Sequence, residues 1–505
     1  MAASMRLALL GLGVLVSGAT ALTGVQPNDE GLMLQAAARI AGGEVPYRDF
    51  WWFYPPGQPY LLGGLHEFFG PSLLTWRIVR VAADATVALL AFELAHRRAG
   101  PLPASAAWLV SIVAMAYPSG PHPFPVALAL ALGALLAFER RPALAGALTG
   151  ACSAWRIEFA VALAAGIALG LLLRRSPRGL RRYAAASVAT AVILYTPVIA
   201  AAGVRPTFDL LVDYPLTDFR DYQTLPFPLS YDGPLNTASL AGFVTDSAEP
   251  LLLHFLPLVL VIGLTAALAT LATGLREPLP AAAGVFSLAM LAYLLTRADL
   301  FHTAPLAVLV GVLGAWAVAR PEPRTASRRR PATAALAALA LLYSAAEGLD
   351  RRWLVLREDT VVLDLPVADG VRVAARQARE LEGAVAAIEK AVPRGDPIYV
   401  ATRRADLVTA GNPLLYVLAH RRNPSRYDIA APGVVTSSRV QREIVADLVS
   451  TRTRLVVRDE DPLTAVREPN AAGRSSGIRV LDDFLAASYV PVARFGSLRL
   501  LARRP

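Results

Sequence analysis

The sequence predicts an all-α polytopic membrane domain of about 11 transmembrane helices, followed by a smaller α/β domain outside the membrane. Three observations predict this fold class. Apolar residues make up 55% of the 505 residues and charged residues only 17%, with a mean hydropathy of +0.46. Apolar runs of about 17–25 residues recur, the length that a helix needs to cross about 30 Å of hydrocarbon. Segment 350–505 is instead charged and alternates helical with strand-like patterns.

Apolar segments with the length and composition of membrane-spanning helices occur from the N-terminus to residue 348. These predicted spans are 5–24, 72–95, 102–118, 122–138, 142–155, 158–173, 183–202, 249–273, 279–296, 303–319 and 332–348. Arginine clusters between the spans indicate their orientation, because short cytoplasmic loops carry an excess of Arg and Lys. With the N-terminus in the cytoplasm, all the clusters fall in cytoplasmic loops, at 97–98, 140–141, 174–182, 276 and 320–330.

This orientation makes 25–71 the first exported loop and 203–248 a second large one. An alternative interpretation of residues 1–24 is a cleaved signal peptide, because Ala19-Thr20-Ala21 resembles a cleavage site. Both interpretations export the 25–71 loop. The composition and orientation together predict a multi-pass membrane protein.

The chain divides by composition into a transmembrane domain, residues 1–348, and an extracytoplasmic α/β domain, residues 349–505. The α/β domain has helical patterns over 371–392 and 437–450. Short apolar runs typical of strands lie at 397–401, 454–457 and 490–502. Alternating strands and helices favour a small α/β fold.

Composition also excludes some classes of function. The net charge of +10 follows the loop pattern described above, so it indicates membrane topology, and we expect no nucleic-acid partner. The single cysteine, Cys152, excludes an internal disulfide and a cysteine-based metal site.

Unusual polar residues gather at the exported ends of the predicted spans. An acidic pair, Asp29 and Glu30, follows the first span directly, and charge at that depth is costly and usually functional. The further candidates on this side are Tyr47, Arg48, Asp49, Tyr54, Arg77, Arg156, Glu158, Arg297, Asp299 and His302. The cytoplasmic loops carry positive charge but no comparable acidic and aromatic cluster.

Purely structural interpretations of these residues remain open. The acidic pair has the alternative role of capping a helix that starts near residue 30, since acids favour helix N-termini. The pairs in 156–158 and 297–299 alternatively stabilise tight turns, and the aromatic run 51–54 alternatively forms an interfacial belt. Arg80 and Asp84, four residues apart on one helix face, are interpreted as neutralising each other.

The pattern resembles the C-type (GT-C) glycosyltransferase superfamily, integral membrane enzymes that take sugar from a polyprenyl phosphate. The resemblance covers nearly the whole chain. The nearest relatives that it indicates are bacterial enzymes similar to protein O-mannosyltransferases and lipid A aminoarabinose transferases. It rests on Asp29-Glu30, Gly43-Glu-Val-Pro-Tyr47-Arg-Asp49-Phe, Tyr54-Pro-Pro-Gly57, Phe69-Gly70, Arg77, Arg156-Ile-Glu158, Arg297-Ala-Asp299-Leu-Phe-His302, Leu414-Leu-Tyr and Arg422-Asn-Pro-Ser-Arg-Tyr427. The long α/β tail and short later spans depart from better-known members, which leaves the acceptor open.

The resemblance implies a polyprenyl-phosphate sugar donor, which is also a membrane lipid, and an acceptor hydroxyl on an envelope glycan, lipid or protein. A carboxylate near that hydroxyl would act as general base, Asp29 first and Glu30 second. Arginine forks suit the departing phosphate, with Arg297, Arg156 and Arg48 as candidates and His302 as a further donor. We expect Asp49, Glu158 and Asp299 to orient these arginines or bind sugar hydroxyls, and Tyr47 and residues 51–54 to line the groove.

No cofactor is required by this chemistry, because a lipid phosphate is already a competent leaving group. A divalent cation stays possible. The rival hypothesis is a transporter or flippase for a lipid-linked or small solute, and a third is an assembly scaffold. Transporters bind substrate near the bilayer midplane. The one-sided cluster at the exported edge therefore favours the transferase.

Overall fold

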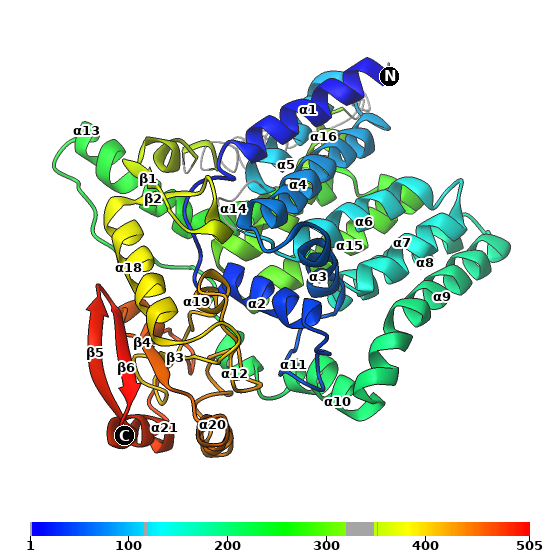
Figure 1. Ribbon diagram of the computed structural model, residues 1–505. Helices are drawn as coiled ribbons and strands as arrows, with labels where there is room; N and C mark the ends of the chain where they lie inside the picture. The colour runs from blue at the N-terminus through cyan, green and yellow to red at the C-terminus, as the bar shows by residue number, and fades with distance from the viewer. Residues whose placement is uncertain (1–2, 116–119, 320–347, 351) are drawn as a thin grey trace.

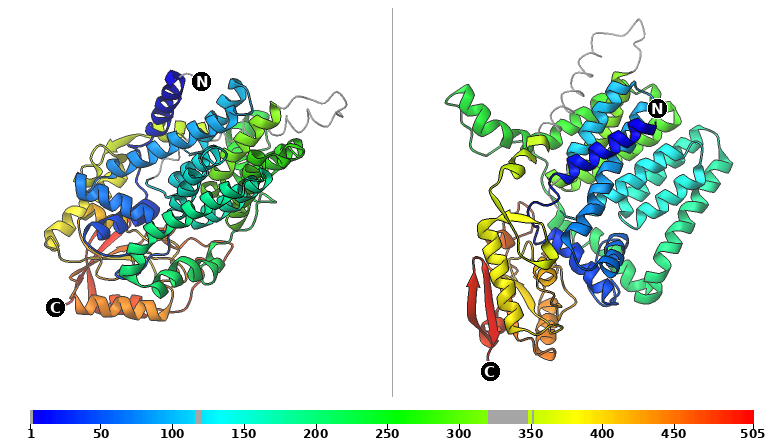
Figure 2. Two further views of the ribbon diagram at one scale, coloured as in Figure 1. Left: turned by 90° about the vertical axis from the view of Figure 1, so that its right-hand side faces the viewer. Right: turned by 45° about the horizontal axis from the view of Figure 1, so that its top comes forward.

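The computed structural model describes residues 3–115, 120–319, 348–350 and 352–505. A helical bundle makes up most of the molecule, and a small α/β unit formed by the C-terminal residues lies against one end of it (Figures 1 and 2). The predicted fold class, a largely helical membrane domain with a C-terminal α/β part, is confirmed at this level.

Each predicted span from 5–24 to 303–319 coincides with a helix. These helices are α1 (Ala3–Gly18), α4 (Leu73–His96), α5 (Pro101–Met115), α6 (Phe124–Ala137), α7 (Pro142–Ser153), α8 (Ile157–Leu173), α9 (Pro177–Ala202), α14 (Ala248–Thr270), α15 (Pro278–Thr296) and α16 (Leu300–Val318). All but the final residue of the last predicted span, 332–348, are outside the described residues.

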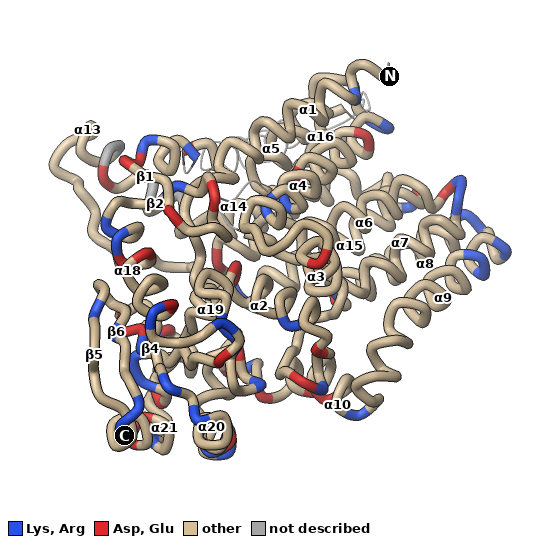
Figure 3. The backbone as a smooth tube through the Cα atoms, in the orientation of Figure 1, with Lys and Arg blue, Asp and Glu red and all other residues tan. Residues whose placement is uncertain are grey.

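Within the described ranges, four helices are long and apolar enough to cross a membrane: α9, residues 253–270 of α14, α15 and α16. Shorter apolar helices are α1, α5, α6 and α8. The apolar helices identify a multi-pass membrane protein, while the number of crossings stays a prediction. Basic residues lie at the ends of the bundle away from the α/β unit (Figure 3), and the orientation of the helices in the membrane stays a prediction.

Local sequence signals explain how these helices begin and pack. Prolines stand in the first turn of α7, α9 and α15, where a missing N–H breaks no helical hydrogen bond. Gly146 and Gly150 let α7 approach α9, because a Cβ at Gly146 would lie 2.1 Å from the Tyr183 oxygen. Such small-residue faces are typical of helix contacts inside membranes.

The first exported loop folds into two helices, α2 (Asp29–Ala41) and α3 (Gly57–Phe69), joined by the aromatic segment. The second loop is built of short pieces: α10 (Val204–Phe208), η1 (Asp209–Asp213), α11 (Tyr214–Leu216), α12 (Arg220–Gln223), α13 (Leu240–Gly242) and η2 (Phe243–Ser247). A short η3 (Gly274–Arg276) precedes α15.

The C-terminal unit contains a four-stranded sheet of order β3-β4-β6-β5. Strand β3 (Tyr399–Thr402) runs parallel to β4 (Leu455–Asp459), and β6 (Leu498–Arg503) pairs antiparallel with β4 and β5 (Tyr489–Phe495). The apolar run 490–502 is therefore a hairpin of two strands. The remaining elements are β1 (Thr360–Val362), β2 (Arg372–Ala374), η4 (Pro366–Ala368), α18 (Ala375–Ala391), α19 (Leu414–Leu418), α20 (Ser438–Ser450), η5 (Pro462–Ala465) and α21 (Val480–Ser488).

The C-terminal unit shares one hydrophobic core with the first exported loop. This core joins Leu34, Trp52 and Trp76 to Leu415 and Val456, which are almost fully buried. Helix α2 packs directly against α19, as Figure 1 shows. A buried ion pair of 2.5 Å between Arg39 of α2 and Asp428 also links the two parts. Residues on both sides of the predicted boundary at 348–349 therefore contribute to one hydrophobic core, while the division into two domains stays a prediction.

We expect Gly31→Ala to loosen this packing, because a Cβ at Gly31 would lie 2.2 Å from the Leu414 nitrogen. Overpacking of this kind costs about 1–3 kcal/mol. Limited proteolysis should cleave the C-terminal unit faster, and the thermal transition in detergent should fall. Gly64→Ala is the matched control, since a Cβ there meets nothing within 4 Å. Equal protease resistance of the two variants would contradict the packing argument.

Candidate active site

Glu30 is held in a buried ion pair with Arg77, which lies on α4. Arg77 Nε donates to Glu30 Oε1 at 2.8 Å and Nη2 donates to Oε2 at 2.9 Å. The Gln26 N–H also donates to Oε2, and Arg77 reaches the carbonyl oxygens of Ala21 and Gly24. The side chains are 0% and 3% exposed. The hydrogen bonds of both predicted site residues are thus made to each other and to the backbone that leads into α2.

Asp29 is exposed, unlike its neighbour. Consecutive helical residues point about 100° apart, so the Asp29 side chain points in a different direction from the buried Glu30 side chain. Desolvation by the surrounding protein raises the pKa of the Asp29 carboxyl, the hydrogen bond from Asn28 opposes this, and Asp299 raises it further. The charges of Arg297 and His302 also act on it. Asp29 therefore lies within electrostatic range of the turn before α16.

The turn before α16 forms a compact group of three side chains. Asp299 caps the helix, because its Oδ1 accepts the His302 backbone N–H at 3.0 Å. The same oxygen lies 2.6 Å from His302 Nδ1, and Oδ2 accepts from Arg297 Nε at 2.8 Å. Desolvation tends to raise the pKa of Asp299, but the hydrogen bond from His302 and the nearby positive charges outweigh it and lower the pKa. Asp299 is thus an ionised acceptor that orients both partners.

Arg297 has a partner that the sequence did not indicate. Glu468, from the C-terminal unit, accepts from Arg297 Nη2 at 2.7 Å and from Nη1 at 3.2 Å. Nη1 also donates to the Gln223 carbonyl oxygen at 3.3 Å. Glu468 was missed because it stands 171 residues away, in a loop without a motif.

Arg156 lies between two tyrosine rings. Its guanidinium carbon is 5.9 Å from the ring centre of Tyr54 and 5.8 Å from that of Tyr293. Nη1 donates to Glu158 Oε1 at 3.2 Å, while Nε is buried and has no hydrogen-bond partner among the described residues. Arg156 therefore keeps donor capacity for a ligand. Tyr293, which sequence reasoning missed, stands four residues before Arg297.

Tyr54 lies where these groups meet. Burial raises its pKa to about 12, Arg156 lowers it, and the charges of Asp29, Glu158 and Arg297 also act on it. Tyr54 thus lies within electrostatic range of the acidic start of α2 and of the turns before α8 and α16. The structure brings together seven predicted residues: Asp29, Tyr54, Arg156, Glu158, Arg297, Asp299 and His302.

Three predicted residues lie apart from these electrostatic contacts. Arg48 and Asp49 pair with each other through two hydrogen bonds of 2.9 and 2.8 Å, and Asp49 also accepts the Val45 N–H. Tyr47 is buried with a φ of +71°, an unusual conformation for a residue other than glycine. Its hydroxyl donates to the Tyr54 carbonyl oxygen at 2.8 Å. Tyr47 thus supports the backbone of a site residue.

Other polar motifs have structural partners. Arg80 and Asp84 lie 3.5 Å apart, as their spacing predicted, and Asp84 accepts from the Ser17 hydroxyl at 2.7 Å. Asp459 is buried and accepts from Asn412, so the segment 459–461 is a hydrogen-bonded turn. No group of three or more metal-ligating side chains occurs within the described ranges.

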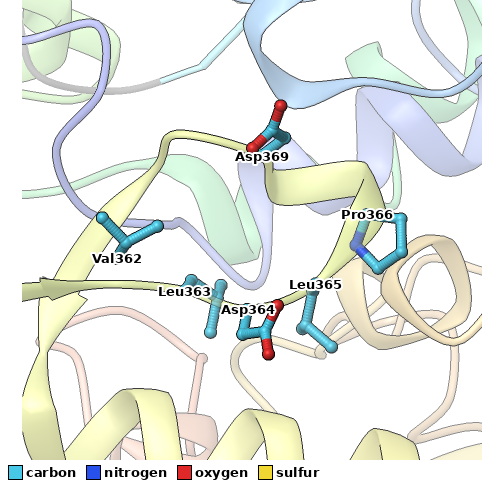
Figure 4. Close-up of a pocket in the computed structure, with 6 residues that line it drawn as sticks. All are labelled: Val362, Leu363, Asp364, Leu365, Pro366 and Asp369. Carbon is cyan, nitrogen blue, oxygen red and sulfur yellow. The ribbon is translucent and has the colours of Figure 1, made fainter.

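A cavity of about 590 Å³ lies elsewhere, in the C-terminal unit (Figure 4). Its lining comes entirely from the segment around η4: Val362, Leu363, Asp364, Leu365, Pro366 and Asp369. It contains none of the predicted site residues. The clustered charges, rather than this cavity, therefore define the candidate site.

The fold is that of C-type membrane glycosyltransferases, which confirms the resemblance at the level of fold. ArnT from Cupriavidus metallidurans, solved with undecaprenyl phosphate, matches at 14% identity and a TM-score of 0.53, over 99% of this chain and 98% of that one. The Archaeoglobus fulgidus oligosaccharyltransferase, solved with a tethered acceptor peptide, matches at 13% identity and a TM-score of 0.55, over 100% of this chain and 74% of that one.

A third similar structure is the mycobacterial arabinofuranosyltransferase AftD. It matches at 16% identity and a TM-score of 0.52, over 100% of this chain and 40% of that one. No protein-family model matches the sequence, and no curated protein matches it either. At these identities the likeness shows the fold alone, so function has to be argued from the site.

We expect Glu30→Gln to destabilise the protein strongly, because it leaves the buried Arg77 charge without a counter-ion. Breaking a buried pair typically costs about 3–5 kcal/mol. The thermal transition in detergent should fall markedly, whereas Asp29→Asn should leave it nearly unchanged. Similar transition temperatures for the two variants would contradict the separate environments described here.

Proposed function

We propose that this protein is a membrane glycosyltransferase that moves a sugar from a polyprenyl-phosphate donor to an acceptor hydroxyl. One observation carries the proposal: an exposed carboxylate, Asp29, shares a charge cluster with two arginines from distant turns, Arg156 and Arg297. The shared fold with known C-type glycosyltransferases supports it, as does the presence of undecaprenyl phosphate in the ArnT structure.

Arg156 is our first candidate for binding the donor phosphate. A guanidinium offers five N–H donors in a fork that fits phosphate oxygens. Arg156 is only 14% exposed, which strengthens its electrostatic attraction for an anion, and it has an unused Nε–H among the described residues. The flanking tyrosine rings hold the guanidinium plane. Arg297 is the second candidate, with Asp299 orienting it.

Asp29 is our candidate for the general base. The acceptor hydroxyl gives its proton to the Asp29 carboxylate while its oxygen forms a bond to the anomeric carbon. The bond from that carbon to the phosphate oxygen breaks, and its electron pair leaves on the phosphate beside the arginines. A raised pKa makes a carboxylate a stronger base near neutral pH. Glu30 is the weaker candidate, because Arg77 already occupies its oxygens.

We also propose that the cluster faces the exported side of a bacterial plasma membrane, with the N-terminus in the cytoplasm. The basic ends of the bundle support this orientation (Figure 3). The acceptor would be an envelope glycan, lipid or protein. We expect that no cofactor is required, since the lipid phosphate is already a competent leaving group, and a divalent cation stays possible.

The decisive experiment incubates purified protein with a panel of polyprenyl-phosphate sugars and candidate acceptors, and identifies products by mass spectrometry. Parallel reactions with EDTA decide whether a divalent cation takes part. A lipid-phosphate sugar that is consumed only with an acceptor supports the proposal. Transfer from no donor, together with movement of a lipid-linked sugar across vesicles, would favour the rival flippase.

We expect Asp29→Asn to lower transfer by about 10²–10⁴-fold, the usual contribution of a general base. In the wild type, the rate should fall as the pH drops through the raised pKa of Asp29, since only the ionised carboxylate accepts a proton. The variant should lose this acidic limb. Glu67→Gln, an exposed carboxylate of the same loop, is the control. Full activity of Asp29→Asn would remove it as the base.

We expect Arg156→Ala to weaken donor use by about 10- to 100-fold, since hydrogen bonds to charged groups contribute about 1.5–3 kcal/mol. The measurement is KM for the lipid donor with acceptor held in excess. Arg205→Ala, a 92% exposed arginine of the second exported loop, should change nothing. An unchanged KM and kcat in Arg156→Ala would exclude it from the site.

A further inference from the structure

Arg297 is almost fully occupied within the protein. Its Nε donates to Asp299, Nη1 donates to both Gln223 and Glu468, and Nη2 donates to Glu468. A guanidinium has five N–H donors, so these bonds leave one. An incoming phosphate therefore cannot bind Arg297 through its fork unless Glu468 withdraws.

The pair with Glu468 has the geometry that a phosphate would use. The two carboxylate oxygens face Nη1 and Nη2 in a fork, the arrangement common to carboxylate and phosphate recognition by arginine. Both side chains are partly exposed, at 21% and 25%. This partial exposure lets another anion approach the pair from solvent. Glu468 is thus a replaceable anion.

Glu468 stands on a self-contained loop of residues 466–473, which we call the Glu468 loop. Arg467 Nη1 donates to the carbonyl oxygens of Asn470 and Ala472, and the Glu468 N–H also donates to Ala472. Gly473 has a φ of +71°, and a Cβ there would lie 2.5 Å from the Val466 oxygen. The loop therefore closes on itself and presents Glu468 without needing its outer contacts.

The tip of the Glu468 loop touches the membrane domain beside Arg297. The Asn470 amide donates to the Tyr222 carbonyl oxygen at 2.8 Å and to Glu468 at 2.9 Å. The Ala471 N–H donates to the Asp221 carbonyl oxygen at 3.2 Å. Among the described residues, loss of the Arg297 pair would leave the tip held to residues 221–222 by the two hydrogen bonds to the Tyr222 and Asp221 carbonyl oxygens.

We propose that Glu468 occupies the phosphate position at Arg297 in the donor-free protein, and that the phosphate of the lipid donor displaces it. This inference rests on the proposed function. Displacement frees the Arg297 fork for the donor and releases the loop tip from residues 221–222. The C-terminal unit thus regulates the site by competition between two anions.

The test compares the binding of a sugar-free polyprenyl phosphate to the wild type and to Glu468→Gln, with a polyprenol lacking phosphate as the reference lipid. The variant should bind the phosphate roughly 5- to 10-fold more tightly, because removing the competing charge raises the fraction of protein ready to bind. Glu460→Gln is the matched control, since Glu460 pairs with Arg494 and Arg499 within the same unit. It should bind like the wild type.

Unchanged or weaker binding by Glu468→Gln would overturn the competition while leaving the proposed function standing. Failure of the wild type to distinguish polyprenyl phosphate from polyprenol would count against both. A second measurement needs no variant: hydrogen exchange in the wild type should quicken at Ala471 when polyprenyl phosphate is added, because its bond to Asp221 breaks. Slower exchange there would contradict the displacement.

Discussion

The buried ion pair of Glu30 and Arg77 is the constraint on which the site depends. It ties the first turn of α2 to the start of α4, and it leaves no spare volume, since a Cβ at Gly120 would lie 2.5 Å from the Glu30 side chain. Because a lone charge there would be very costly, the two side chains keep each other in place. The helical turn between consecutive residues then points Asp29 in a different direction, within electrostatic range of Arg297. Glu30 thus anchors the helix, and Asp29 is the carboxylate that the proposed function uses.

Much of the fold follows from the sequence because membrane burial imposes a strong pattern. Apolar length predicted the ten helices that coincide with predicted spans, and helical periodicity predicted α18 and α20. The helices within the two large loops, such as α3 and α12, were not predicted. The site was predictable only as a list of exported polar residues. Periodicity does not tell which member of the pair at 29–30 is buried, nor that Arg48 binds Asp49 instead of joining Arg156.

Contacts between distant segments were beyond sequence reasoning. Glu468 carries no local signal, and its role becomes visible only once the fold brings it to Arg297. The predicted division near residue 349 is based on composition, which carries no information about packing between the two sides. Apolar residues of the first loop, such as Trp52 and Phe50, share a core with Leu415 and Val456. A compositional boundary marks where the surroundings of the chain change, and packing can cross it.

This shared core has a consequence for the order in which the molecule is made. Chains emerge from the ribosome with the N-terminus first, and domains generally fold as they appear. The aromatic residues of segment 50–53 are synthesised some 160 residues before Tyr214 and Phe219, whose rings contact those of Trp51 and Phe53, and some 350 residues before the strands of the same core. The core around this segment is therefore completed in stages. The end of translation supplies the last stage, and a chain that stops early would lack the C-terminal part of the core.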